Sequence, residues 1–285
     1  MVAEPESDLS QVTSRAPIGV FDSGVGGLSV LKVINQTLPA EDLIFLADQA
    51  HVPYGSRSLE EVQAFSEGIT RFLLIQRVKM IVVACNTASA AALHHLRRLF
   101  PQTPFVGMEP AVKPAAELTR SGVVGVLATP ATFQGALYAS VIERFANEVT
   151  VLQGTCPGLV MAIEAGQLDS VEVKTILEKA LQPMLAQGID TVVLGCTHFP
   201  FVIPMIEKIV GPQVRVIDPA PAVARQVGRL SDIHSLHTFS ANSGRMRFLT
   251  TGDPEQMEGL LPKLIGQISP VHPAYWDAGR LTCEI

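Results

Sequence analysis

Short apolar runs alternate with segments of helical length along most of this chain, and no other feature constrains its fold as strongly. The segments 28–38, 59–75 and 88–100 have helical length and largely helical spacing. The apolar runs of the first half are residues 18–21, 43–47, 80–84 and 105–108. Such short unbroken runs are typical of strands that are buried on both faces, as in a parallel sheet flanked by helices. The alternation therefore predicts an α/β fold.

The second half of the chain repeats this pattern at an offset of 106 to 111 positions. Residues 192–197 fall on residues 81–86, so that Cys196 matches Cys85. The other matching runs are 124–127 on 18–21, 149–152 on 43–46, and 214–217 near 104–107. For the weaker runs, the alternative is that any two α/β units look alike. We expect two similar parallel-sheet α/β domains related by a pseudo-twofold axis, with the site between them at the carboxyl ends of the strands.

Composition and charge exclude several classes of partner. The net charge of −6 argues against binding to nucleic acid, because no excess of basic residues is available for a phosphate backbone. No apolar run approaches the roughly 18 residues needed to span a bilayer, so no membrane partner is expected. The first residues carry Glu4, Glu6 and Asp8 where a secretory signal has a basic region. We therefore expect a cytoplasmic protein whose four cysteines are free thiols.

The two matching cysteines each end a predicted strand and precede a helix. A helix N-terminus lowers the pKa of a thiol from about 8.5, so Cys85 and Cys196 are predicted to be reactive. Either one alone could be a buried, inert side chain, but matching positions would bring both to one pocket. Two opposed thiols can remove a proton from one face of a carbon and return one to the other, which is racemisation or epimerisation. A disulfide, or a zinc site with His198, is a weaker alternative because the cytosol is reducing and a fourth ligand is missing.

The loops that follow the strands indicate how a substrate is held. The loop 22–27, Asp-Ser-Gly-Val-Gly-Gly, offers backbone amides to an anion, but Ser29 breaks both the dinucleotide and the P-loop motifs. Asp22 could also be a simple helix cap, and the Pro-Tyr-Gly turn at 53–55 an ordinary turn. Arg57 is the single cation near these loops, so carboxylates are expected to bind neutral donors. The hydroxyl groups available are those of Ser23, Thr87, Ser89, Thr129, Thr132 and Thr197.

Cofactor chemistry is not indicated by these loops. The seven lysines lie outside them, so no Schiff base with pyridoxal phosphate is expected, and neither a cofactor nor a metal is predicted. His198 could act as a general acid beside the second thiol. Glu164, in a predicted helix, would by default be a solvated surface charge.

Four motifs in this order resemble those of the glutamate racemases. They are residues 21–28 (Phe-Asp-Ser-Gly-Val-Gly-Gly-Leu), 53–55 (Pro-Tyr-Gly), 84–88 (Ala-Cys-Asn-Thr-Ala) and 195–200 (Gly-Cys-Thr-His-Phe-Pro). Members of that family interconvert L- and D-glutamate without pyridoxal phosphate or metal and supply D-glutamate for peptidoglycan. The resemblance implies the same activity here. The alternatives are a racemase of a related acid such as aspartate, or a non-catalytic amino-acid-binding protein.

The resemblance also implies roles for individual residues. Cys85 and Cys196 would act on the α-proton from opposite faces, assisted by Asp22 and His198. The positions that match substrate-binding residues are Asp22, Ser23, Tyr54, Gly55, Asn86, Thr87, Thr197 and His198. Supporting roles are expected for Asp48, Thr132 and Glu164. Met161 stands where the family often has proline, which weakens the assignment of Glu164.

The family organisation implies limits for the two domains. The first would comprise residues 17–108 and 218–285, and the second residues 109–217. Residues 1–16 are polar and unpatterned, which predicts a mobile N-terminal tail. No motif is readable after residue 266. The resemblance leaves a homodimer open.

Overall fold

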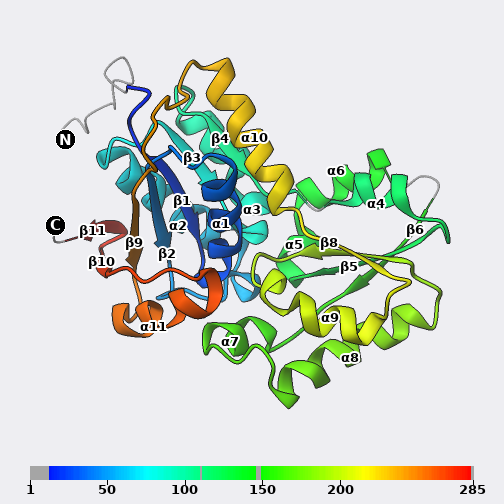
Figure 1. Cartoon of the computed structure of the whole chain (residues 1–285). Coiled ribbons are helices and arrows are strands. Elements are labelled where there is room, and N and C mark those ends of the chain that lie inside the picture. Colours follow the sequence, from blue (N-terminus) through cyan, green and yellow to red (C-terminus); the bar gives the residue numbers. More distant parts are fainter. Residues whose placement is uncertain (1–12, 110, 146–148, 284–285) are drawn as a thin grey trace.

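Two β-sheets carry the fold in the computed structural model, which describes residues 13–109, 111–145 and 149–283. The larger sheet has the strand order β11-β10-β9-β2-β1-β3-β4, and the smaller one has the order β6-β5-β7-β8 (Figure 1). The strands of the larger sheet are β1 (Ile18–Asp22), β2 (Leu43–Ala47), β3 (Met80–Val83), β4 (Phe105–Gly107), β9 (Met246–Thr250), β10 (Val271–Asp277) and β11 (Arg280–Cys283). Those of the smaller sheet are β5 (Val123–Ala128), β6 (Thr150–Gly154), β7 (Thr191–Gly195) and β8 (Arg215–Ile217).

The internal repeat predicted from the sequence is present in the sheets. The order β2-β1-β3-β4 of the larger sheet is the same as the order β6-β5-β7-β8 of the smaller one. All of these neighbours pair in parallel, and only β10 with β11 is antiparallel among the strand pairs of the described residues. The prediction of two similar parallel-sheet α/β units is therefore confirmed.

Helices cover both faces of each sheet, as the apolar strands require. Alternate residues point to opposite faces, so Val20 belongs to one apolar cluster and Phe21 to the other. On the larger sheet, one face is covered by α1 (Leu28–Thr37), α10 (Ala220–Ile233) and α11 (Pro254–Ile265), and the other by α2 (Leu59–Ile75) and α3 (Asn86–Leu99). On the smaller sheet, one face carries α7 (Leu159–Glu164), α8 (Val171–Leu185) and α9 (Ile203–Val210), and the other α4 (Val112–Leu118) and α6 (Ala136–Phe145).

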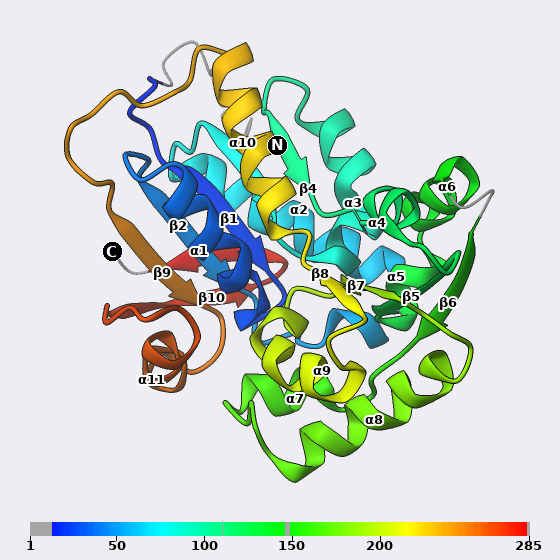
Figure 2. The same cartoon turned by 45° about the vertical axis from the view of Figure 1, so that its right-hand side comes forward.

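The chain passes between the two units twice, after β4 and after β8. Helix α10 returns to the larger sheet and packs beside α1 (Figure 2). The short helix α5 (Pro130–Gln134) of the second unit contacts α3 and the turn η3 (Tyr54–Ser56) of the first. This arrangement brings the loops after β1, β3 and β7 to one region between the units.

The fold does not test the predicted domain limits, and it describes only part of the predicted N-terminal tail. The strands of residues 17–108 and 218–285 share one sheet and those of 109–217 the other, while the domain limits themselves stay a prediction. The predicted mobile tail comprises residues 1–16, of which residues 1–12 lie outside the described residues. Its last residues are bound to the fold, since the Ser14 carbonyl accepts a hydrogen bond from the Thr238 hydroxyl at 2.7 Å. Strands β9 to β11 follow from no pattern that the sequence analysis identified. Among the residues that the structure describes, none of the helices is long and apolar enough to cross a membrane.

Candidate active site

A narrow cavity lies between the strand ends of the two units. Cys85 follows β3 of the first unit and Cys196 follows β7 of the second, and both line the cavity. The other lining residues are Ser23, Pro53, Tyr54, Gly55, Asn86, Thr87, Thr129, Val160, Thr197 and His198. The four cysteines are free thiols, and no cluster of His, Cys, Asp and Glu within the described ranges is placed to hold a metal ion. The two matching cysteines therefore belong to one site.

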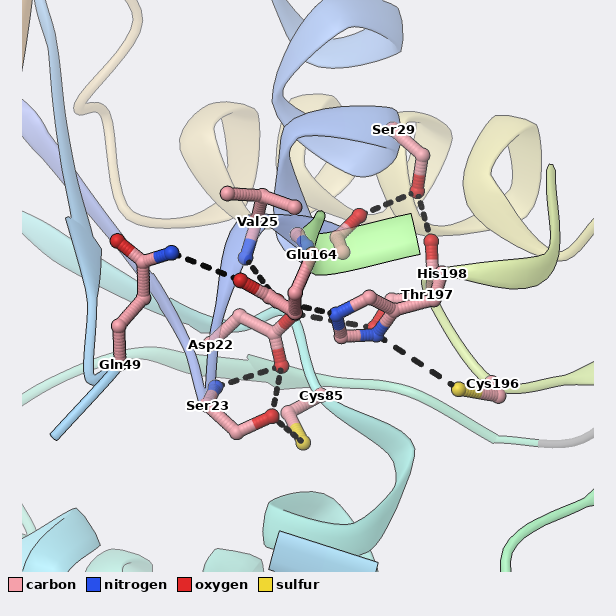
Figure 3. A network of polar contacts seen from close by, with 12 residues as sticks. Asp22, Ser23, Val25, Ser29, Gln49, Cys85, Glu164, Cys196, Thr197 and His198 are labelled. Atoms are coloured by element: carbon pink, nitrogen blue, oxygen red, sulfur yellow. Dashed lines mark hydrogen bonds and ion pairs between the residues drawn. The ribbon is translucent and has the colours of Figure 1, made fainter. Parts of the chain in front are cut away.

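Cys85 is the N-cap residue of α3, and a chain of hydrogen bonds joins it to a carboxylate. Its Sγ accepts a hydrogen bond from the Ala88 amide at 3.5 Å and donates to Ser23 Oγ at 3.9 Å. Ser23 Oγ in turn donates to Asp22 Oδ1 at 3.3 Å (Figure 3). Burial and the nearby charge of Asp22 raise the pKa of Cys85 well above its usual range. The predicted lowering is wrong for this residue, because burial outweighs the Ala88 amide.

Cys196 belongs to a matching chain on the other side of the cavity. Its Sγ lies 3.8 Å from His198 Nδ1, and His198 Nε2 lies 2.6 Å from Glu164 Oε1 (Figure 3). Burial alone would lower the pKa of His198, but the contacts with Cys196 and Glu164 outweigh it and place this pKa well above its usual value. His198 is therefore a buried imidazolium at neutral pH, held between a thiol and a carboxylate.

Glu164 is a buried anion rather than the solvated charge expected by default. It is the last residue of α7, with 4% of its surface exposed. Its carboxylate accepts hydrogen bonds from the Val25 amide at 2.8 Å and from Gln49 Nε2 at 2.7 Å. The loop 22–27 thus binds an anion through its backbone, as predicted, and that anion is a side chain of the protein itself. Met161, which stands where the family often has proline, is 48% exposed, whereas Glu164 is buried. The difference at position 161 therefore does not remove Glu164 from the interior.

The glycines of this loop allow the second unit to approach closely. A Cβ on Gly24 would lie 1.9 Å from Glu164 Oε1, and one on Gly26 would lie 2.3 Å from His198 Nδ1. Any side chain at either position would push this acid–imidazole pair away from the loop. The glycine-rich motif therefore serves close packing between the units rather than phosphate binding.

Asp22 binds amides of its own loop and also links the two units. Oδ1 accepts from the Ser23 amide at 2.7 Å, and Oδ2 accepts from the Gly27 amide at 2.6 Å and from the Thr197 hydroxyl at 3.1 Å. Burial raises the pKa of Asp22, while the positive charge of His198 acts in the opposite direction. Asp22 is the last residue of β1, and the helices that follow have Gly24 and Gly27 as their N-cap residues, so the alternative of a simple helix cap is wrong.

Neutral polar groups form the rest of the cavity wall. The side-chain amide of Asn86 is buried, and neither its oxygen nor its nitrogen has a hydrogen-bond partner among the residues that the structure describes. The hydroxyl of Thr87 lies 2.9 Å from that of Thr129 and 3.3 Å from that of Thr132. Arg57 does not line the cavity and donates instead to the His51 carbonyl at 3.3 Å. The expectation of neutral donors agrees with these residues, and His198 is the lining residue that departs from it.

Three lining residues were missing from the predicted site. Thr129 had a signal, since its hydroxyl belongs to a strand-end loop. Pro53 also had one, since it begins the Pro-Tyr-Gly motif at residues 53–55, whereas Val160 had none.

Asp22 was expected to contact the substrate, and it does not line the cavity. The expected supporting residues Asp48, Thr132 and Glu164 do not line it either. Asp48 Oδ2 accepts a hydrogen bond from the Tyr54 hydroxyl at 2.6 Å, which places it behind the cavity wall.

Comparison with known proteins assigns the family. The family model of Asp/Glu/hydantoin racemases matches residues 18–227. A glutamate racemase from Ectopseudomonas mendocina is 50% identical over 259 residues, which cover 91% of this chain and 98% of that protein. The crystal structure of glutamate racemase from Francisella tularensis in complex with D-glutamate has a TM-score of 0.80 and 31% identity, covering 93% of this chain and 98% of the other. The Escherichia coli glutamate racemase in complex with L-glutamate and the activator UDP-MurNAc-Ala has a TM-score of 0.78 and 32% identity, covering 90% and 98%.

The fold and the sequence are those of an amino-acid racemase, which is an isomerase. The aligned region covers 98% of the Ectopseudomonas protein, so no large segment of that relative lacks a counterpart in this chain. The chain belongs to the Asp/Glu/hydantoin racemase family and, within it, to the glutamate racemases.

Replacing Glu164 by glutamine tests the charge pairing of His198. The wild-type pKa of His198 is raised, so its contribution to stability is complete below about pH 6.5 and is lost as the pH rises through the folded pKa. Glu164→Gln keeps the shape and removes the charge, so the pKa of His198 should fall. The loss of stability should still begin at about pH 6.5, but it should be smaller and end at lower pH than in the unmodified protein. Imidazole NMR shifts followed against pH measure the change.

Glu67→Gln is the matched control. Glu67 pairs with His95 at 3.1 Å on the surface, where both side chains are more than a quarter exposed. The control should leave the titration of His198 unchanged. Identical His198 titrations in Glu164→Gln and in the unmodified protein would contradict the pairing.

Proposed function

We propose that the protein interconverts L- and D-glutamate without a cofactor, using Cys85 and Cys196 as the two proton-transferring groups. The observation that carries this proposal is that both thiols line one cavity from equivalent strand ends of two similar units. Relatives with similar chains are glutamate racemases, and two of them were crystallised with D- or L-glutamate. The cavity lining, within the described residues, includes no lysine that could form a Schiff base.

The reaction consists of two proton transfers at the α-carbon. A thiolate on one face takes the α-proton, which leaves the electron pair on carbon and converts the thiolate to a thiol. The thiol on the opposite face gives its proton to that electron pair and becomes a thiolate. The result is inversion with no net change in protons, and the reverse direction exchanges the two roles.

The two thiols are supported differently. Cys85 has a raised pKa and therefore keeps its proton at rest, so it begins as the acid. Cys196 is then the base in this direction, and His198 Nδ1, 3.8 Å from its Sγ, is placed to donate a hydrogen bond to that sulfur. Asp22 reaches Cys85 through Ser23 and accepts its proton when the roles are reversed. In this proposal Asp22 and His198 assist the thiols rather than act on the substrate carbon.

The hard step is the formation of negative charge at the α-carbon. Fixed donors in a cavity without bulk water stabilise such charge more than water does. Asn86, with an unpartnered amide, and the hydroxyls of Thr87 and Thr197 line the cavity and are suited to hold carboxylates. Ser23, Tyr54, Gly55 and His198 complete the proposed substrate-binding set. Among the supporting residues, Thr132 would act through the hydroxyl of Thr87.

The product fits a role in cell-wall synthesis. D-glutamate is a building block of peptidoglycan, and the relative from Escherichia coli was crystallised with a UDP-MurNAc-Ala activator. We propose that this protein supplies D-glutamate for peptidoglycan in the cytoplasm. The homodimer stays a prediction.

Substrate choice is tested with the unmodified protein and no added cofactor. L-glutamate, D-glutamate and L-aspartate are incubated separately, and inversion is followed by circular dichroism. Glutamate should be racemised in both directions, and aspartate, which is one methylene shorter, about 10- to 200-fold more slowly. Faster turnover of aspartate would make the protein an aspartate racemase, and binding without inversion of either acid would make it a binding protein.

Single cysteine variants test the two-thiol scheme. Cys85→Ser and Cys196→Ser should each lower racemisation by about 10²- to 10⁴-fold, because one face loses its acid or base. In D2O, each variant should still exchange the α-proton of the one enantiomer that faces the remaining thiol, and the two variants should prefer opposite enantiomers. α-Proton NMR measures this exchange.

Cys283→Ser is the control, since Cys283 lies on β11 and does not line the cavity. It should racemise glutamate at the unmodified rate. Near-normal racemisation by either cavity variant would refute the scheme.

A further inference from the structure

The buried carboxylate of Asp48 connects the C-terminal strands to the wall of the cavity. Its Oδ2 accepts from the Tyr54 hydroxyl at 2.6 Å and lies 2.8 Å from His51 Nδ1. Its Oδ1 accepts from the indole Nε1 of Trp276 at 2.7 Å and from the Thr251 hydroxyl at 2.8 Å. Asp48 has no exposed surface. Oδ2 therefore binds side chains of the loop that follows β2, and Oδ1 binds side chains from the C-terminal part of the chain.

Trp276 has a defined place on the larger sheet. It lies on β10 and pairs with Leu281 of the antiparallel strand β11, while the first residues of β10 pair in parallel with β9. Strand β9 pairs in turn with β2, whose end leads into Asp48. A Cβ on Gly68 of α2 would lie 2.6 Å from the indole ring, so the ring is packed directly against that helix. The rings of His51 and Phe65 lie 5.4 and 6.2 Å from it between centroids. The indole N–H is thus held in position by strand pairing and by packing.

Tyr54 connects Asp48 to the cavity wall. It lines the cavity, is 1% exposed and begins the turn η3. Burial and the charge of Asp48 raise the pKa of its phenol well above the usual value, so the hydroxyl keeps its proton for Asp48. The next residue, Gly55, is packed against the other unit, because a Cβ there would lie 2.8 Å from Thr129 Cβ. A displaced Tyr54 ring would therefore move the backbone that forms one wall of the cavity.

We propose that Trp276 is a positioning residue for substrate binding, which acts by fixing Asp48 and, through it, the Tyr54–Gly55 wall. This gives a function to the C-terminal strand pair, which lies beyond the residues matched by the family model. The inference rests on the proposed racemase function. It involves the wall of the cavity rather than the two thiols, so its effect falls on binding more than on proton transfer.

The test is the steady-state kinetics of the full-length Trp276→Phe variant in both directions. Phenylalanine keeps an aromatic ring and removes the N–H donor. KM should rise about five- to tenfold for both enantiomers, while kcat stays within about twofold, because binding of the ground state and of the transition state is weakened alike. Gly68→Ala, which displaces the ring from the other side, should produce the same split. Tyr275→Phe, an exposed ring on the same strand, should leave both constants unchanged.

A double-mutant cycle separates positioning from general stability. If Trp276 acts through Tyr54, then adding Trp276→Phe to Tyr54→Phe should cause no further rise in KM. An additive rise, or an unchanged KM in Trp276→Phe alone, would overturn the positioning role. If the unmodified protein failed to racemise glutamate, the proposed function itself would be refuted, which is a different result.

Discussion

The two α/β units are joined by buried hydrogen bonds that belong to the site itself. Glu164 of the second unit accepts from the Val25 amide of the first, and Asp22 of the first accepts from Thr197 of the second. Each of these carboxylates also ends a chain of contacts that begins at a thiol. Buried charges are costly unless they are paired, so contact between the units and the ionisation of the site depend on one another.

The site between the units is also tightly enclosed. The cavity has a volume of about 20 Å³, which is room for about one water molecule. Electrostatic interactions are stronger in such an enclosed space than in bulk water. The proposed proton transfers would take place in this environment.

Much of the fold and the centre of the site could be predicted because both follow from local pattern and repetition. The matching positions of Cys85 and Cys196 placed them in one cavity before any contact was known. Glu164 could not be found from pattern, because its burial depends on a loop 139 residues away. The pKa of Cys85 is raised rather than lowered, because burial among the residues around it outweighs the hydrogen bond from the Ala88 amide. Strands β9 to β11 were not predicted, because the internal repeat does not include them.

The most direct test of the two-thiol account follows the circular dichroism of enantiopure L-glutamate in D2O with the unmodified protein. If one thiol removes the proton and the other delivers a deuteron, each product molecule carries a C–D bond and returns more slowly than the substrate reacts. The account predicts that the signal crosses zero, overshoots toward D-glutamate and then returns, with the mirror image from D-glutamate. A monotonic decay to zero would show that a single group removes and returns the proton, which would contradict the account.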